Sequence, residues 1–202
     1  MLTCFDVANY FCWLAKTLSS SLTHMALQKH VYYAQGFHLG LYGKPLFIEE
    51  IKAWDHGPVV PLLWQECTRY GSNPIPAPEY LDISLYSELQ ITLLDRVYSK
   101  FGHLNAFLLS EMTHNEPTWK NAYPQGVITT DAMKEFFETC LNSDNSLKNC
   151  LLPSNNNNLK QQPDVNSVTP TVESNLRKSK GFQAYLASKN ERSEVYRRLA
   201  ES

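Results

Sequence analysis

A chain of 202 residues fits one domain with an appendage better than two full domains. Its formal net charge of -2 argues against a broadly basic nucleic-acid-binding protein, and no apolar run approaches the roughly 18 residues of a membrane-spanning helix. The charge is uneven: residues 1–147 hold 9 basic and 15 acidic side chains, whereas residues 148–202 hold 9 and 5. This asymmetry predicts an acidic folded body followed by a basic tail.

The five cysteines include no CxxC pair. Cys12 falls within an apolar helical pattern, where a free thiol packs as a small hydrophobic group. The first residues lack the basic start and long apolar run of a signal peptide. We therefore expect a cytoplasmic protein with free thiols.

Apolar residues at helical spacing predict a first helix over about residues 5–18 and a second helix that begins after Thr23, a residue able to cap it. Gly36 and Gly40 lie within this second helix, where the usual reason for a glycine is the close approach of another element. Gln28 and Lys29 have two interpretations, a polar handle for a partner or a solvated helix edge.

A change of pattern after the second helix predicts a short two-stranded β element, with residues 46–48 and 51–54 as its extended pieces and a turn over residues 55–58. Further helices are expected over about residues 60–70, 87–100 and 105–112. A last helix of the body is expected near residues 131–140, capped by Thr130.

The composition becomes polar and of low complexity from residue 142, with four consecutive asparagines at 155–158, which predicts a flexible linker over residues 142–178. Apolar spacing returns near the end and predicts a C-terminal amphipathic helical segment over residues 179–202. Its apolar residues are Phe182, Tyr185, Leu186, Val195 and Leu199.

Motifs that would carry catalysis are mostly missing. The six histidines are scattered with no HExxH, and neither a phosphate-binding glycine loop nor GxSxG occurs, so we expect no metal and no cofactor. Two arrangements stay open as sites of chemistry: a nucleophile pair of Cys67 and His56, and an acid–base pair within residues 114–117. The competing interpretations are a buried thiol with a loop histidine, and polar groups that cap or form a turn.

Three motifs in the first half carry a resemblance: LQKHVYYAQG at residues 27–36, LYGKPLF at 41–47 and IKAWDHGPV at 51–59. In this order and spacing they closely resemble the Panacea-domain family of SocA-like, phage-associated proteins. THNEPTW at residues 113–119 and the segment 128–137 are similar to further parts of the family pattern, so the resemblance covers roughly residues 4–141. His30 and His56 depart from it, since the family usually has an apolar residue and a tyrosine there.

The resemblance implies a mainly α-helical fold and a role as an antitoxin that neutralises a toxin encoded beside it. We therefore expect a single compact Panacea-like helical domain over residues 4–141 with a short two-stranded β element, followed by the flexible linker and the C-terminal helix. The expected partner is a cognate toxin protein. The alternatives are a proteolytic adaptor that delivers a partner to a protease, as at least one family member does, and an enzyme using His56 or His114.

Two surfaces are candidates for partner binding. Around the Gly-Pro turn, Trp54, His56 and Pro58 would form a rigid aromatic anchor, unless Trp54 is simply buried. In the tail, apolar and basic residues would fold onto the toxin and cover it, unless they dock on the chain's own acidic body. The tail candidates are Phe182, Tyr185, Leu186, Arg192, Val195, Arg197 and Leu199.

Overall fold

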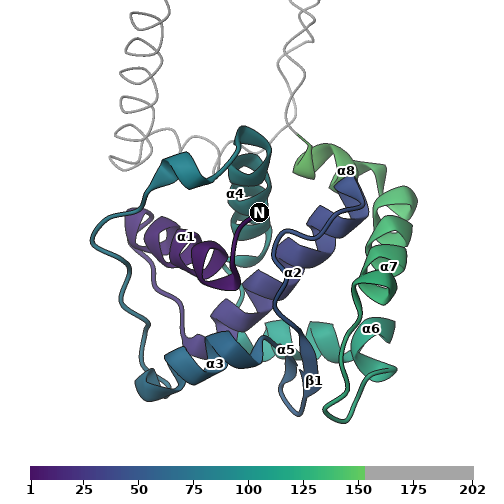
Figure 1. Ribbon diagram of the computed structural model, residues 1–202, viewed down its shortest axis with the longest axis horizontal. Coiled ribbons are helices and arrows are strands. Elements are labelled where there is room, and N and C mark those ends of the chain that lie inside the picture. Colours follow the sequence, from purple (N-terminus) through teal and green to yellow (C-terminus); the bar gives the residue numbers. More distant parts are fainter. Residues whose placement is uncertain (153–202) are drawn as a thin grey trace, which may run out of the picture. The chain divides into compact units, whose positions relative to one another are not determined.

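The computed structural model describes residues 1–152, which are mainly α-helical with one two-stranded antiparallel sheet (Figure 1), as the sequence predicts. Residues 1–15 and 21–152 belong to one compact unit. The elements are α1 (Cys4–Thr17), α2 (His24–Tyr42), β1 (Lys52–Trp54), β2 (Gly57–Val59), α3 (Pro61–Cys67), two 3-10 turns (Thr68–Tyr70 and Ile83–Leu85), α4 (Glu88–Phe101), α5 (Ala106–His114), α6 (Pro117–Lys120), α7 (Thr130–Ser143) and α8 (Asn145–Leu151). Within this part of the chain, no helix combines the length and the apolarity needed to cross a membrane.

Helix α2 runs through the middle of the unit, and α4, α5 and α7 pack against it (Figure 1). Thr23 caps it as predicted, because the Thr23 hydroxyl accepts the backbone N–H of Ala26 at 3.4 Å. Gly43 ends it with a φ of 66°, a left-handed conformation that favours glycine. Most side chains of α2 are buried, including several polar ones.

Close packing of α7 explains the glycines of α2. A Cβ at Gly36 would overlap the ring of Phe137, and a Cβ at Gly40 would lie 2.9 Å from the backbone carbonyl carbon of Phe137. The predicted close approach of another element is therefore confirmed, and that element is α7.

The two-stranded sheet is present, but one of its strands differs from the prediction. β1 pairs with β2 in the register Lys52 to Val59, not with residues 46–48. Residues 46 and 47 are held instead by the side chain of Gln35, whose Oε1 accepts the N–H of Leu46 at 2.7 Å and whose Nε2 donates to the carbonyl of Phe47 at 2.9 Å. Because one buried amide satisfies this backbone, the segment needs no partner strand.

The body also extends beyond the boundaries expected from composition. Thr129, rather than Thr130, caps α7, since its hydroxyl accepts the N–H of Ala132 at 3.2 Å. Helix α8 lies within residues 142–178, the expected linker; Asp144 caps it, and Leu151 is fully buried. The rest of that segment and residues 179–202 lie outside the described residues.

Candidate functional site

A pocket of about 380 Å³ lies between the start of α2, the β1–β2 hairpin and α3. We call it the α2 pocket. Such a volume falls within the range of about 300–1,000 Å³ that is usual for small-ligand sites. The side chains that line it and that carry polar or aromatic groups include His24, Gln28, Lys29, Trp54, His56 and Trp64.

Lys29 is the unusual residue of the α2 pocket, because it is completely buried. Its Nζ donates one hydrogen bond, to the carbonyl of Pro58 at 3.0 Å, and it forms no ion pair with any described residue. Burial without a counter-charge lowers its pKa to about 7. Gly57 leaves room for the Lys29 side chain, because a Cβ at this position would lie 2.6 Å from both Lys29 Cε and Thr113 Oγ1. Its φ of 99° also favours glycine.

Two neighbours of Lys29 leave polar atoms unused. The side-chain carbonyl of Gln28 accepts the N–H of Val60 at 2.8 Å, which fixes the orientation of the amide. Its Nε2 is buried and has no hydrogen-bond partner among the described residues, and the same holds for Nδ1 of His24. A buried polar atom without a partner costs free energy on the order of 1–3 kcal/mol, so such atoms mark a place where a ligand can contribute hydrogen bonds.

Aromatic rings form one wall of the α2 pocket. Trp54 and Trp64 meet edge to face with ring centroids 5.3 Å apart, and the His24 ring lies 6.2 Å from that of Trp64. The backbone of Trp54 is held by Trp119, whose indole N–H donates to its carbonyl at 3.0 Å. The wall is therefore fixed from both sides.

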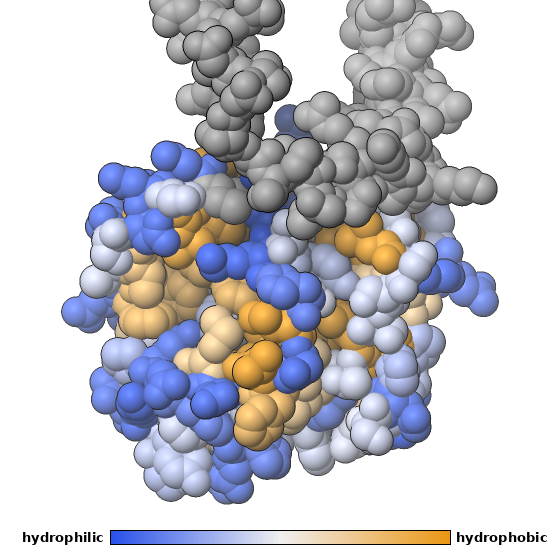
Figure 2. All heavy atoms as spheres, turned by 180° about the vertical axis from the view of Figure 1, so that it is seen from behind, coloured by the Kyte–Doolittle hydropathy of each residue, from blue (hydrophilic) through white to orange (hydrophobic). Residues whose placement is uncertain are grey.

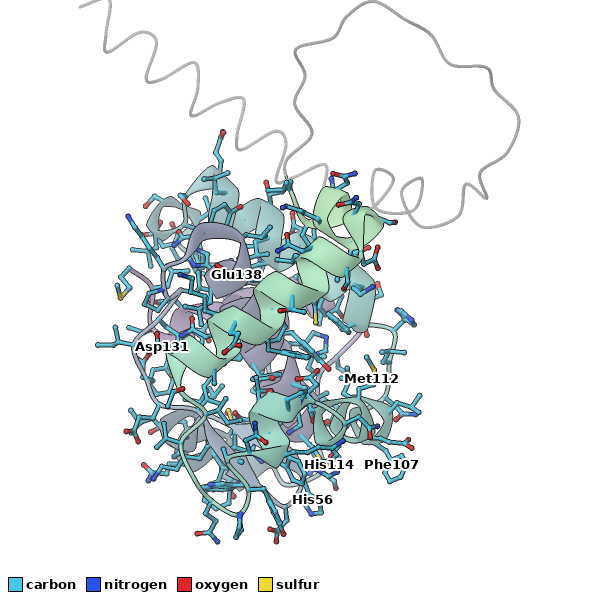
Figure 3. The ribbon with its side chains drawn as sticks, turned by 90° about the vertical axis from the view of Figure 1, so that its right-hand side faces the viewer. His56, Phe107, Met112, His114, Asp131 and Glu138 are labelled. Atoms are coloured by element: carbon cyan, nitrogen blue, oxygen red, sulfur yellow. The ribbon has the colours of Figure 1, made fainter. Side chains whose placement is uncertain are left out.

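Positive or titratable groups gather around this site although residues 1–147 are acidic as a whole. Burial, followed by the charge of Lys29, lowers the pKa of both His24 and His114. The charge of His56 lowers the pKa of His114 further. Figure 3 shows His56 and His114 at the same end of the described part. The chemistry of the site is therefore suited to an anion or to a hydrogen-bond acceptor.

The residues predicted around the turn occupy three different environments. Trp54 is half-buried in the wall of the α2 pocket, His56 is exposed at the tip of the hairpin, and Pro58 is buried in β2. The seven candidates in the tail lie outside the described residues. Gln28 and Lys29 do not form a solvated helix edge, since both are buried.

The residues considered for chemistry are also distributed. Burial raises the pKa of the Cys67 thiol, which disfavours the thiolate. Glu116 lies against α2, where it accepts hydrogen bonds from the hydroxyls of Tyr32 and Tyr33, and burial raises its pKa to about 7. His114 instead stacks on Trp119, with ring centroids 4.2 Å apart. Among residues 1–152, no three potential metal ligands are gathered to hold an ion.

Helix α5 presents an apolar surface next to the hairpin. Its inner face is fixed by Ser110, whose hydroxyl donates to the carbonyl of His56 at 2.8 Å. Its outer face exposes three large apolar side chains, which we call the α5 strip: Phe107 (70% exposed), Leu108 and Met112. α5 lies on the far side in Figure 1, and apolar side chains gather on the corresponding near face in Figure 2, among hydrophilic ones.

Comparison with known proteins finds one protein family to which part of the chain is similar. Residues 27–120 match the model of a family described as "Antitoxin SocA-like, Panacea domain", so the resemblance predicted from the sequence is confirmed. The matched residues include most of α2, the hairpin and α5, and therefore the α5 strip and most of the residues that line the α2 pocket, although His24 lies outside the match. Neither the curated proteins nor the solved structures contain a match.

Proposed function

Since residues 27–120 match an antitoxin SocA-like Panacea domain, we propose that this protein is an antitoxin that neutralises a toxin protein by direct complex formation. The toxin docks on the α5 strip and on the exposed hairpin tip at His56. Neutralisation by binding needs a rigid surface with apolar side chains that lose their water when the partner arrives, rather than a reactive group.

The α5 strip is the observation that carries this proposal. Phe107, Leu108 and Met112 are exposed on one face of a helix whose other face is fixed to the body. Aromatic residues and methionine are enriched in protein interfaces. Full burial of a side chain such as Phe107 contributes about 2 kcal/mol to binding, and the rigid helix lowers the entropy lost on association.

Residues 179–202 supply the second contact of the proposal. Their apolar residues and the basic Arg192 and Arg197 would cover an acidic surface of the toxin. The excess of basic residues after position 147 supports a role for this segment in charge-directed binding. Full-length protein and a variant lacking residues 179–202 separate this contact from that of the α5 strip.

The experiment tests the double variant Phe107→Ser, Met112→Ser. Its control is Tyr80→Ser, which removes an exposed aromatic side chain that does not belong to α5. Products of the flanking genes are first expressed alone, and the one that arrests growth serves as the toxin and is then co-expressed with each variant. We expect the double variant to bind it at least about 10-fold more weakly and to lose growth rescue, while its thermal unfolding is unchanged.

Full rescue and wild-type affinity in the double variant would contradict docking on the α5 strip. Unchanged rescue without residues 179–202 would remove that segment from the mechanism. The half-life of the toxin is followed in the same cells, because faster loss of the toxin in the presence of this protein would indicate delivery to a protease instead of neutralisation in a complex.

A further inference from the structure

We propose that the α2 pocket is a carboxylate-binding site, with Lys29 Nζ and Gln28 Nε2 as its hydrogen-bond donors and Trp54 and Trp64 as its aromatic wall. This inference goes beyond the proposed function, because docking on the α5 strip requires no ligand in the pocket.

The first argument is the set of unused donors. An ammonium group carries three N–H donors, and Lys29 uses one of them on Pro58. The Gln28 amide cannot rotate away to find a partner, because Val60 holds its carbonyl end at 2.8 Å. Both side chains are at least 99% buried and line the same pocket. A ligand with two acceptor oxygens would satisfy both residues at once.

The second argument is charge. Lys29 has no anionic partner among the described residues, His24 and His56 line the same pocket, and the charge of Lys29 lowers the pKa of His114. The acidic side chain among the lining residues, Asp55, is exposed at the hairpin turn. Burial lowers the pKa of Lys29, which disfavours its charged form. An anion bound beside it would restore the charged form of the lysine.

The third argument is shape and the number of donors. The paired indoles favour a planar group, and the volume of about 380 Å³ accommodates a small ring with one acidic substituent. One ammonium and one amide match the single charge and two oxygens of a carboxylate. A phosphate usually attracts more donors and an arginine fork, and no arginine lines this pocket. The carboxylate belongs either to a free small molecule or to an acidic side chain of a partner protein.

The test uses benzoate as the probe, benzamide as its neutral match and inorganic phosphate as a second anion, with the full-length chain. Binding is followed by tryptophan fluorescence, and the pKa of Lys29 by NMR of its side chain. We expect benzoate to bind at least about 10-fold more tightly than benzamide, and to raise the pKa of Lys29. Lys29→Met and Gln28→Leu should each weaken benzoate binding, whereas Lys120→Met, on the exposed surface of α6, should not.

Equal binding of benzoate and benzamide, unchanged benzoate binding by Lys29→Met, or binding of phosphate without benzoate would each overturn the proposal. The source of the carboxylate is then determined by two measurements. A carboxylic acid released on denaturing protein from the native host identifies a free molecule. Loss of toxin binding in Lys29→Met identifies an acidic side chain of the partner. Benzoate binding involves no toxin, so its failure leaves the proposed antitoxin function untouched.

Discussion

The buried lysine of α2 makes a quantitative prediction about stability. The pKa of Lys29 is about 7 in the folded protein and 10.5 in its ordinary state. Between these values the unfolded chain binds more protons than the folded one, so the free energy of unfolding rises with pH in this window. Below pH 7 the lysine is charged in both states and the full cost of its burial is present. Above pH 10.5 it is neutral in both and the cost is gone.

Lys29→Met removes this titration and keeps the length of the side chain. Each pH unit within the window is worth about 1.4 kcal/mol, so wild-type protein gains about 3 kcal/mol between pH 6 and pH 9 from this residue alone. The variant lacks that gain. The variant's free energy of unfolding minus that of wild type should therefore be about 3 kcal/mol larger at pH 6 than at pH 9, so the substitution stabilises the protein most at pH 6. The hydrogen bond to Pro58 is donated by an ammonium at pH 6 and by a neutral amine at pH 9, and the difference in its strength is already contained in the folded-state pKa of Lys29.

The assay is urea unfolding at pH 6 and pH 9 in buffers without carboxylates, followed by circular dichroism in the presence of a reducing agent. Taking the difference between variant and wild type removes the contribution of the titrating groups that do not interact with Lys29. His24 and His114 are the exceptions, because the charge of Lys29 lowers the pKa of each, and their small contribution falls at the pH 6 end of the window. Lys120→Met serves as the exposed control and should show no change with pH. The difference in free energy of unfolding between Lys29→Met and wild type is compared at the two pH values. If it is the same at pH 6 and pH 9 within about 0.5 kcal/mol, Lys29 does not have a strongly lowered pKa.

Three further predictions address packing, the buried acid and a helix cap, each measured by urea unfolding. Gly36→Ala should destabilise the protein by about 1–3 kcal/mol through overlap with Phe137, and Phe137→Leu in the same chain should recover part of this; additive losses would speak against the contact. The pKa of Glu116 is raised from 4.5 to about 7, so between these pH values the folded state binds more protons than the unfolded state. The free energy of unfolding should therefore fall by about 3 kcal/mol as the pH rises from 4.5 to 7. Glu116→Gln should remove this fall, and the same slope in the variant would count against it. Thr129→Ala should cost about 1 kcal/mol by removing the cap of α7 while Thr130→Ala costs little, and the reverse order would restore the cap to Thr130.

Much of the helical architecture was predictable, because local signals determine it. A polar cap followed by an apolar repeat locates the start of a helix, and Thr23 and Asn105 both act in this way. Gly36 and Gly40 indicated a close neighbour because glycine otherwise weakens a helix. The cap of α7 was misplaced by one residue because Thr129 and Thr130 carry the same chemistry, and only the local backbone determines which hydroxyl accepts the bond.

The pairing of the hairpin and the α2 pocket depend on contacts far apart in sequence. Residues 46–48 have the composition of a strand, but the side chain of Gln35 bonds to backbone groups of residues 46 and 47, and no local pattern reveals this. A lysine within a helix is usually solvated, so its burial follows only from the elements that enclose it. Gly57 is the decisive example: its importance lies in the missing Cβ above Lys29, which the sequence alone presents as an ordinary turn.

The β1–β2 hairpin connects the two surfaces to which we assign binding. On one side its residue Pro58 accepts the hydrogen bond from Lys29, and on the other the carbonyl of His56 accepts the hydroxyl of Ser110 in α5. The lysine and Thr113 of α5 both lie against Gly57, where no side chain intervenes. A ligand that draws Lys29 toward the α2 pocket therefore acts on the same short turn that a partner on the α5 strip would contact. If occupancy of the α2 pocket changes the affinity at the α5 strip through this turn, a partner on the strip must change the affinity of the pocket by the same factor.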